Sequence, residues 1–212
     1  MRVIDLTHPI HSGMPVYPGT PPPQFHRVSR VETEGFTEHG LTFTTHTGTH
    51  LDAPAHMLSG AATLDRLDPQ NFVGPGIVLD VTAGGKTQVE VDDLVPRPEG
   101  LRGKDFVLLH SGWSRHWGSP AYFSGYPVLS DGAARWLADM GLKGVGVDMI
   151  SVDAPDASDY PIHKILLRQG VILIENLQNL SALQGLAFTF VCLPLNVHNA
   201  DGCPVRAVAL PV

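Results

Sequence analysis

Residues 46–56 read His-Thr-Gly-Thr-His-Leu-Asp-Ala-Pro-Ala-His, and this stretch constrains its own backbone more tightly than any other part of the chain. On a helix, where each residue turns the chain by about 100°, Asp52 would lie roughly 200° away from His50. On an extended chain, His46, His50 and Asp52 point to the same side, and Gly48 leaves space between the two imidazoles. The neighbouring threonines also favour a strand. We therefore predict an extended segment that directs these three side chains at one point.

The same stretch carries the ligand types of a metal site. Imidazole nitrogens together with a carboxylate oxygen suit Zn²⁺, Mn²⁺ or Fe²⁺. Pro54 is expected to bend the chain and bring His56 to the same place. Each residue also has an ordinary structural interpretation, since Asp52 could simply form a turn and His56 could lie in a loop. Their convergence within eleven residues favours the metal site.

Away from this stretch, short runs rich in β-branched residues are bounded mostly by Gly or Pro, which is typical of strands. They cover residues 3–6, 77–81, 106–109, 145–147, 171–174, 188–193 and 205–210. Several are continuously apolar, which predicts burial on both faces. Ser130–Met140 and Pro161–Gln169 have helical starts, and each is followed by Gly. We expect an α/β fold, with residues 1–212 forming one domain in which a few helices pack on a mixed, largely buried sheet.

Composition excludes several classes of protein. The chain has 212 residues and a formal net charge of -7, with 14 Lys+Arg and no basic block, which argues against a nucleic-acid partner. No run approaches the roughly 18 apolar residues of a membrane span. The first residues read directly into a strand without a signal-peptide pattern, so we expect a cytoplasmic protein. Cys192 and Cys203 are expected to be free and buried.

Residues 46–56 match the pattern HxGTHxDxPxH at every fixed position. The chain thereby resembles the metal-dependent cyclase family, which includes bacterial kynurenine formamidases (arylformamidases) and isatin hydrolases. Further similar segments run from Ile4-Asp5-Leu6-Thr7 to Pro204-Val205-Arg206-Ala207 and include Gly146-Val147-Asp148, Ser151-Val152-Asp153 and Glu175-Asn176-Leu177. The resemblance covers nearly the whole chain and implies the swivelling β/β/α fold of that family.

The resemblance also implies roles for individual residues. The positions that match metal ligands are His46, His50, Asp52, His163 and Glu175, with Asp52 shared between two divalent ions. Zn²⁺ is the first expectation for these ions and Mn²⁺ the alternative. Glu175 directly follows the apolar run 171–174, and a carboxylate at the end of a buried strand needs a cation or several donors. Read alone, it could equally be a solvated acid at a strand end.

Two further residues are implicated in chemistry by the same resemblance. His56 matches the catalytic acid/base, a task suited to a group that titrates near pH 6.5. Tyr17 stands in Pro15-Val16-Tyr17-Pro18-Gly19, where kynurenine formamidases usually carry Trp, and it is expected to bind substrate by stacking. Tyr17 could instead only brace a proline-rich loop. His8 and His198 are expected to lie near the site without contacting substrate.

The implied activity is hydrolysis of an aryl formamide or amide such as N-formylkynurenine, as in tryptophan catabolism, through a metal-activated water and His56. One alternative is hydrolysis of a cyclic amide or ester, or a cyclase step. Another is a metal-binding protein without catalytic activity. The resemblance further implies a small-molecule substrate and a homodimer or homotetramer. The aromatic segment 113–126 could form a lid, a dimer contact or a packed surface loop.

Overall fold

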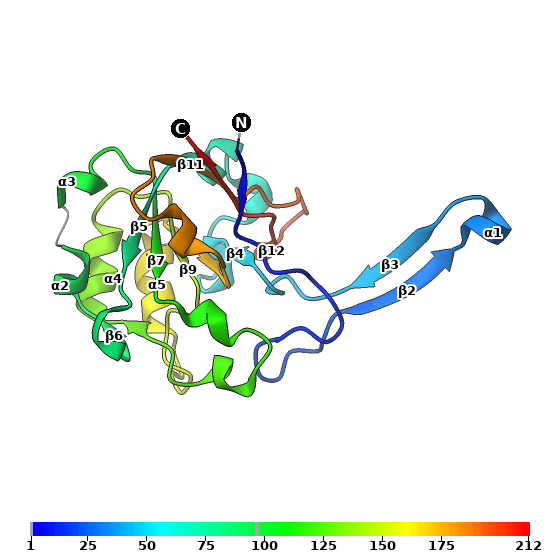
Figure 1. The fold of residues 1–212 in the computed structure, drawn as a ribbon, viewed down its shortest axis with the longest axis horizontal. Coiled ribbons are helices and arrows are strands. Elements are labelled where there is room, and N and C mark those ends of the chain that lie inside the picture. Colours follow the sequence, from blue (N-terminus) through cyan, green and yellow to red (C-terminus); the bar gives the residue numbers. More distant parts are fainter. Residues whose placement is uncertain (1, 96–97) are drawn as a thin grey trace.

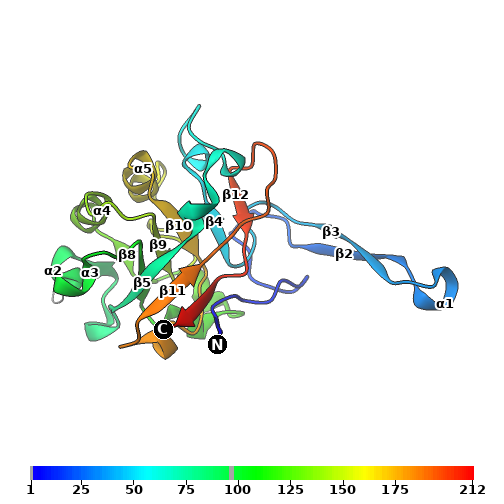
Figure 2. The same ribbon diagram turned by 90° about the horizontal axis from the view of Figure 1, so that it is seen from above.

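The computed structural model describes residues 2–95 and 98–212, which are built around one nine-stranded mixed sheet (Figures 1 and 2). The strand order is β1-β13-β11-β5-β7-β9-β10-β4-β12. Its strands are β1 (Ile4–Asp5), β4 (His50–Asp52), β5 (Val73–Asp80), β7 (Phe106–His110), β9 (Gly144–Val147), β10 (Ile172–Glu175), β11 (Phe188–Val191), β12 (Gly202–Pro204) and β13 (Val208–Pro211). The four central strands β5, β7, β9 and β10 run parallel, and the outer pairings are antiparallel. The predicted mixed α/β sheet is confirmed.

Helices cover one face of this sheet (Figure 2). They are α2 (Val91–Leu94), α3 (Pro98–Leu101), α4 (Asp131–Ala138) and α5 (Pro161–Arg168). Helix α4 begins as predicted, because the Ser130 side chain accepts a hydrogen bond from the Ala133 N–H. Helix α5 begins at a proline, whose missing N–H is no loss in the first turn. In the described residues no helix is both long and apolar enough to cross a bilayer.

The remaining elements are short. Strands β6 (Gln88–Val89) and β8 (Val128–Leu129) pair in parallel. Short 3₁₀ turns lie at Pro54–His56, Leu64–Arg66, Pro69–Phe72, Ala83–Gly85, Trp113–His116, Pro120–Phe123 and Leu180–Leu183. The turn at Pro54 follows β4 directly, so the chain bends where the proline predicted it.

Strand β7 shows how the core is divided between the two faces of the sheet. Val107 and Leu109 are fully buried in the cluster under the helices, whereas Phe106 and Leu108 are fully buried in the cluster on the opposite face. Each such side chain contributes roughly 1.5–3 kcal/mol when it is removed from water. The continuously apolar run 106–109 therefore marks a strand covered on both sides, as predicted.

The neighbouring strand β9 carries a glycine, Gly146, where side chains from both sides pack closely against its backbone. A Cβ on Gly146 would lie 2.5 Å from Leu108 Cδ2 and 2.7 Å from Leu177 Cδ1. Only glycine lets both leucines pack across the strand at this point. The close packing holds the chain just after β10 against β9, and this is where the candidate site begins.

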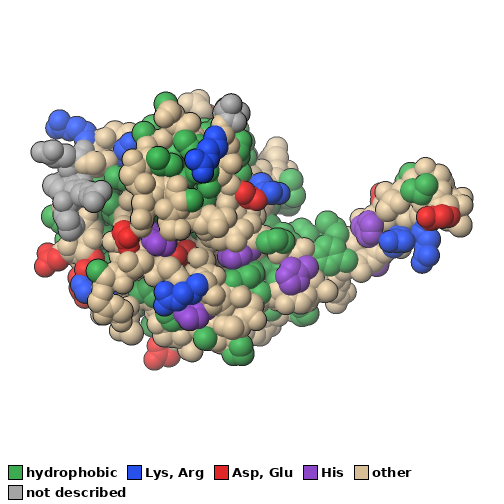
Figure 3. Space-filling model, in the orientation of Figure 1, with side chains coloured by type: hydrophobic (Ala, Val, Ile, Leu, Met, Phe, Trp, Pro, Cys, Tyr) green, Lys and Arg blue, Asp and Glu red, His purple; other side chains and the backbone are tan. Residues whose placement is uncertain are grey.

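A long hairpin arm extends away from the sheet (Figures 1 and 2). It consists of β2 (Gln24–Ser29), α1 (Val31–Glu34) at its tip and β3 (Glu38–Thr42), and Pro21, Pro22 and Pro23 precede it. Apolar, charged and histidine side chains are all visible on its surface (Figure 3). The exposed apolar residues of the arm are Phe25, Val28, Val31, Phe36 and Leu41. The arm has no counterpart among the predicted strands.

Two sequence predictions need correction. The segment 46–52 is not one extended strand, because Gly48 adopts a left-handed conformation (φ 65°) and β4 begins only at His50. The predicted strand over 205–210 begins later than expected, because residues 205–207 lie between β12, which ends at Pro204, and β13, which begins at Val208. Here the Val205 N–H still donates to Thr49 O, whereas Ala207 O accepts from the Leu6 N–H, so the chain changes its partner segment.

Candidate metal centre

The centre lies where β4 and β10 run antiparallel. The register pairs Glu175 with His50 and Leu173 with Asp52. Since side chains alternate along a strand, His50, Asp52 and Glu175 lie on the same face of the sheet. Each offers a ligand atom, and these atoms lie within 4.8 Å of one another in a buried setting. Strand pairing thus joins residues more than 120 positions apart in the sequence, a juxtaposition that the local pattern around residue 50 could not give.

His163 approaches this group from the first turn of α5. Its Nε2 lies 3.3 Å from Glu175 Oε1 and 3.7 Å from Asp52 Oδ2. Its Nδ1 donates to Asp153 Oδ2 at 2.6 Å, and Asp153 also accepts from the backbone N–H groups of Ile162 and His163. Asp153 therefore fixes both the start of the helix and the direction of the imidazole. Sequence analysis matched Asp153 to the family without giving it this role.

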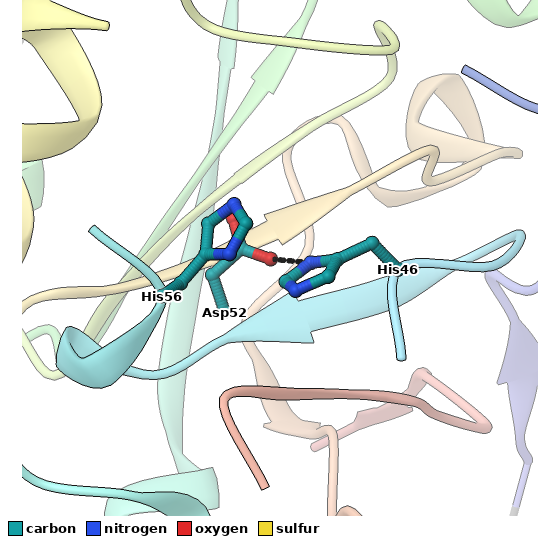
Figure 4. A group of neighbouring side chains, drawn as sticks. All are labelled: His46, Asp52 and His56. Atoms are coloured by element: carbon teal, nitrogen blue, oxygen red, sulfur yellow. Dashed lines mark hydrogen bonds and ion pairs between the residues drawn. The ribbon is translucent and has the colours of Figure 1, made fainter. Parts of the chain in front are cut away.

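On the other side of Asp52 lie two more histidines (Figure 4). His46 Nδ1 is 2.7 Å from Asp52 Oδ1, and the His46 and His56 rings are 3.8 Å apart between centroids. His46, Asp52 and His56 form a second group of ligand atoms within 4.8 Å. Asp52 therefore belongs to two groups at once. The position of His56 is compatible with both metal ligation and proton transfer.

Sequence analysis missed Asp201. Its Oδ2 lies 2.9 Å from His46 Nε2 and 3.4 Å from His56 Nδ1. The residue directly precedes β12, which pairs with β4. A Cβ on the next residue, Gly202, would lie 2.4 Å from the His46 ring, so glycine makes room for that imidazole. The available signal was its place just before the last segment that resembles the family.

Two carboxylate oxygens in the centre test whether a cation fits. Asp52 Oδ2 and Glu175 Oε1 are buried, and neither makes a hydrogen bond of good geometry in the described part of the chain, although His163 Nε2 lies 3.3 Å from Glu175 Oε1. A buried carboxylate oxygen without a partner is costly, and a bound cation removes that cost. Imidazole and carboxylate ligands together suit a divalent ion such as Zn²⁺ or Mn²⁺. The residues present fit such an ion.

The charges in the centre point the same way. Burial lowers the pKa of His163, but Asp153 and Glu175 outweigh it and raise the pKa to about 10. Burial likewise opposes protonation of His46, but Asp52 and Asp201 raise its pKa to about 9. The carboxylates therefore create a negative field strong enough to hold protons on buried imidazoles. A divalent cation satisfies the same field.

A cavity of about 380 Å³ opens onto these groups. Its lining residues are Pro15, Val16, Tyr17, Thr20, His46, Gly48, His50, His56, Met57, Ile150, Ser151, Tyr160, His163, Glu175 and Asn176. Tyr17 lies on the wall, where burial and a hydrogen bond with Tyr160 raise its pKa to about 12. The cavity has room for a small aromatic molecule beside the metal-ligand groups.

The aromatic segment 113–126 packs against the body beside this cavity. Trp117 stacks on His8 with 4.0 Å between ring centroids, and Tyr122 is fully buried. Within the single chain this segment is packed, and the lid and dimer-contact interpretations stay predictions. The backbone N–H of His8 donates to Thr49, next to His50, so His8 does lie near the site. His198 does not, because its side chain is 84% exposed and pairs with Asp65.

Comparison with known proteins gives consistent matches. The family model Cyclase ("Putative cyclase") matches residues 4–154. The kynurenine formamidase of Bacillus cereus (strain ATCC 14579) is 32% identical over 99% of this chain and 97% of its own. Isatin hydrolase A from Labrenzia aggregata, solved with benzyl benzoate, has a TM-score of 0.88 and 26% identity over 98% of this chain and 93% of its own. A structure described as a predicted metal-dependent hydrolase from Bacillus stearothermophilus has a TM-score of 0.78 and 31% identity over 98% of this chain and 97% of its own.

Proposed function

The chain belongs to the cyclase family of metal-dependent hydrolases, and from this premise we propose that it hydrolyses the amide bond of an aryl formamide such as N-formylkynurenine. The observation that carries the proposal is that Asp52 and Glu175, each with a buried oxygen that makes no hydrogen bond of good geometry in the described residues, lie among histidines beside a cavity. A polar cluster with unmet demand for a cation belongs to catalysis more readily than to stability.

We assign His46, His50, Asp52, His163 and Glu175 as ligands of two divalent ions, with Asp52 shared between them. Asp52 directs Oδ1 towards His46 and Oδ2 towards His163, which supports its sharing between two ions. The donor types support Zn²⁺, with Mn²⁺ as the alternative. A bound divalent ion would polarise a carbonyl oxygen and lower the pKa of water to about 7.

We assign proton transfer to His56. Burial lowers its pKa despite the charge of Asp52, so the imidazole is neutral near pH 7 and able to accept a proton. Asp201 lies 3.4 Å from Nδ1, which leaves Nε2 to exchange the proton. His56 then takes a proton from the attacking water and returns it to the leaving amine. Tyr17, on the cavity wall, is assigned to contact the aryl ring.

A second candidate activity is the opening of a cyclic amide or ester. It is supported by the similarity to isatin hydrolases and by Tyr17 in the place of the tryptophan that kynurenine formamidases usually carry. Both activities use the same metal ligands and the same proton transfer. They differ in whether the product is a formate and an amine or one ring-opened molecule.

A side-by-side assay tests the proposal. Protein loaded with Zn²⁺ or Mn²⁺ is given N-formylkynurenine and isatin separately, and kcat/KM is measured for each with metal content determined by mass spectrometry. We expect the larger kcat/KM with N-formylkynurenine. A larger value with isatin would establish the second candidate instead. Fully loaded protein that is inert to both, and to a wider panel of amides and esters, would leave a metal-binding protein without this activity.

We further propose that two or more copies of the chain associate through the hairpin arm. A two-stranded hairpin alone is marginally stable in water, and this one exposes five large apolar side chains, which supports a partner surface. Light scattering on the purified chain is expected to give a dimer or tetramer, and a monomer at micromolar concentration would contradict this. We also propose that residues 1–212 form one domain and that the protein is cytoplasmic, which the two free cysteines support.

A further inference from the structure

Asn176, directly after Glu175, has an unusual backbone conformation. Its φ is 58°, in the left-handed region that asparagine tolerates better than most residues with a side chain. Its backbone N–H donates to Met149 O, and the Leu177 N–H donates to Val147 O. The turn after β10 is therefore held on β9, and the Asn176 side chain is directed towards the loop before β4.

Both ends of the Asn176 amide are satisfied inside the protein. Nδ2 donates to Gly48 O at 2.9 Å, and Oδ1 accepts from the Tyr122 hydroxyl at 2.7 Å. The Thr49 hydroxyl also donates to Asn176 O at 2.6 Å. Asn176 and Thr49 are buried, and Tyr122 is fully buried. The side chain is thus a bridge between the left-handed Gly48 and the aromatic segment.

The carbonyl of Gly48 links this bridge to the metal centre. His50 Nδ1 lies 2.8 Å from Gly48 O, which can only accept, so Nδ1 carries the hydrogen. The other ring nitrogen of His50, Nε2, lies 3.4 Å from Asp52 Oδ1 and 3.6 Å from Glu175 Oε2, so it faces the metal-ligand group. Such a hydrogen bond on the remote nitrogen fixes the tautomer and the ring orientation of a metal-binding histidine.

From these contacts we infer that Asn176 is a positioning residue for the metal centre: by holding the Gly48 carbonyl in place, it sets the direction and tautomer of His50. The inference rests on the proposed metal ligation by His50. An aspartate at this position could not donate to Gly48 O, and a glycine would keep the backbone turn while removing the bridge. Asn176 therefore acts through its amide, beyond its tolerance of the left-handed conformation.

Tyr122 is part of the same arrangement. Its hydroxyl is donated to Asn176, and its ring meets Trp117 edge-on with 5.1 Å between centroids. Rotation of the amide would turn Oδ1 towards Gly48 O and oppose two acceptors, so the hydrogen bonds to Gly48 O and from the Tyr122 hydroxyl together hold one orientation. The packed segment 113–126 thereby contributes to the geometry of His50 without contacting it.

The test compares two asparagines in left-handed conformations. The two variants are Asn176→Gly and Asn179→Gly. Glycine adopts both backbone conformations without strain, since φ is 58° at Asn176 and 59° at Asn179. Asn179 Nδ2 also donates to a backbone carbonyl, that of Asp5, but at an exposed place away from the centre. Comparing the two variants therefore separates the effect of losing the hydrogen bond beside His50 from the general effect of losing an asparagine side-chain hydrogen bond.

Zn²⁺ affinity of the full chain is measured by competition with a chromophoric chelator, together with the thermal unfolding midpoint of the metal-free protein. We expect Asn176→Gly to bind Zn²⁺ about 10–100-fold more weakly, as for other outer partners of metal ligands. Asn179→Gly should bind Zn²⁺ like the unaltered chain. Tyr122→Phe, which keeps the ring and the packing, should weaken binding in the same direction by a smaller factor.

The outcomes are separable. Unchanged Zn²⁺ affinity in Asn176→Gly, or an equal loss in Asn179→Gly, would overturn the inference while leaving the proposed function in place. If Asn176→Gly does not fold, unchanged affinity in Tyr122→Phe would overturn it instead. An unaltered chain that binds neither Zn²⁺ nor Mn²⁺ would overturn the proposed function itself, before any variant is compared.

Discussion

The molecule contains two antiparallel strand pairs with opposite surroundings. The pair β4–β10 lies inside the nine-stranded sheet, with β9 and β12 on its outer sides, and every residue of both strands is buried. The pair β2–β3 stands alone as the arm, where only Ser29 is buried. Buried pairing can hold charged groups at fixed distances because neighbours on all sides prevent rearrangement. An isolated ribbon cannot, so the chemistry lies in the first pair and the second is available for association.

The largest expected effect comes from Asp52→Asn, which tests whether the buried pair is a metal centre. The change keeps the side-chain shape but removes the charge common to both ligand groups. We expect metal content to fall to background and hydrolysis to be lost, measured by mass spectrometry and substrate assay. Asp65→Asn, which alters an acid that accepts from the Thr63 hydroxyl and pairs with exposed His198, is the control. Full metal content in Asp52→Asn would show that the β4–β10 pair is not the metal centre.

His56→Ala asks whether proton transfer and metal binding are separate within the centre. If His56 moves the proton, turnover should fall by about 10²-fold or more while bound metal is unchanged. The same metal analysis decides the case, because His56 also lies in a ligand group. Loss of one metal equivalent would reassign His56 as a ligand, and unchanged turnover would exclude it from the reaction.

Removing the metal should lower the stability of the folded chain, and this loss should arise at the β4–β10 pair and not at the arm. A ligand at 100 times its Kd stabilises the folded state by about 2.7 kcal/mol, which corresponds to roughly 5–10 °C in Tm for a chain of this size. We expect a chelator to lower Tm by about this amount and excess Zn²⁺ to restore it. The same shift is expected in a chain with an altered arm, if the two regions are independent. A Tm that does not respond to chelator would mean that Asp52 and Glu175 need no cation.

The smallest effect on stability is expected from the arm. Phe36→Ser and Leu41→Ser alter side chains that are both 55% exposed, so each should change the free energy of unfolding of one subunit by only about 0.5 kcal/mol or less. Association should weaken, which light scattering over a range of protein concentrations would detect. If both variants keep the native oligomeric state, the arm is not the contact surface.

Prediction from sequence succeeded where the signal was local. The pattern of His46, His50 and Asp52 predicted converging ligands, and they converge although Gly48 breaks the strand that was expected to align them. Asp201 escaped notice because its relation to His46 depends on the pairing of β12 with β4, which no spacing along the chain encodes.

The arm escaped notice for a different physical reason. The strand signal in a sequence comes from burial of one or both faces, and β2 and β3 have neither face covered by the body. By contrast, the run 106–109 is apolar at every position because both of its faces are covered, and its strand was predicted with nearly correct ends.

The prolines at the base of the arm have a mechanical consequence. Pro21, Pro22 and Pro23 join the cavity wall, which ends at Thr20, to the first residue of β2. Each proline fixes its own φ near −65°, so this connection has little slack. The prolines therefore restrict the directions in which the arm can leave the cavity wall that Tyr17 and Thr20 line.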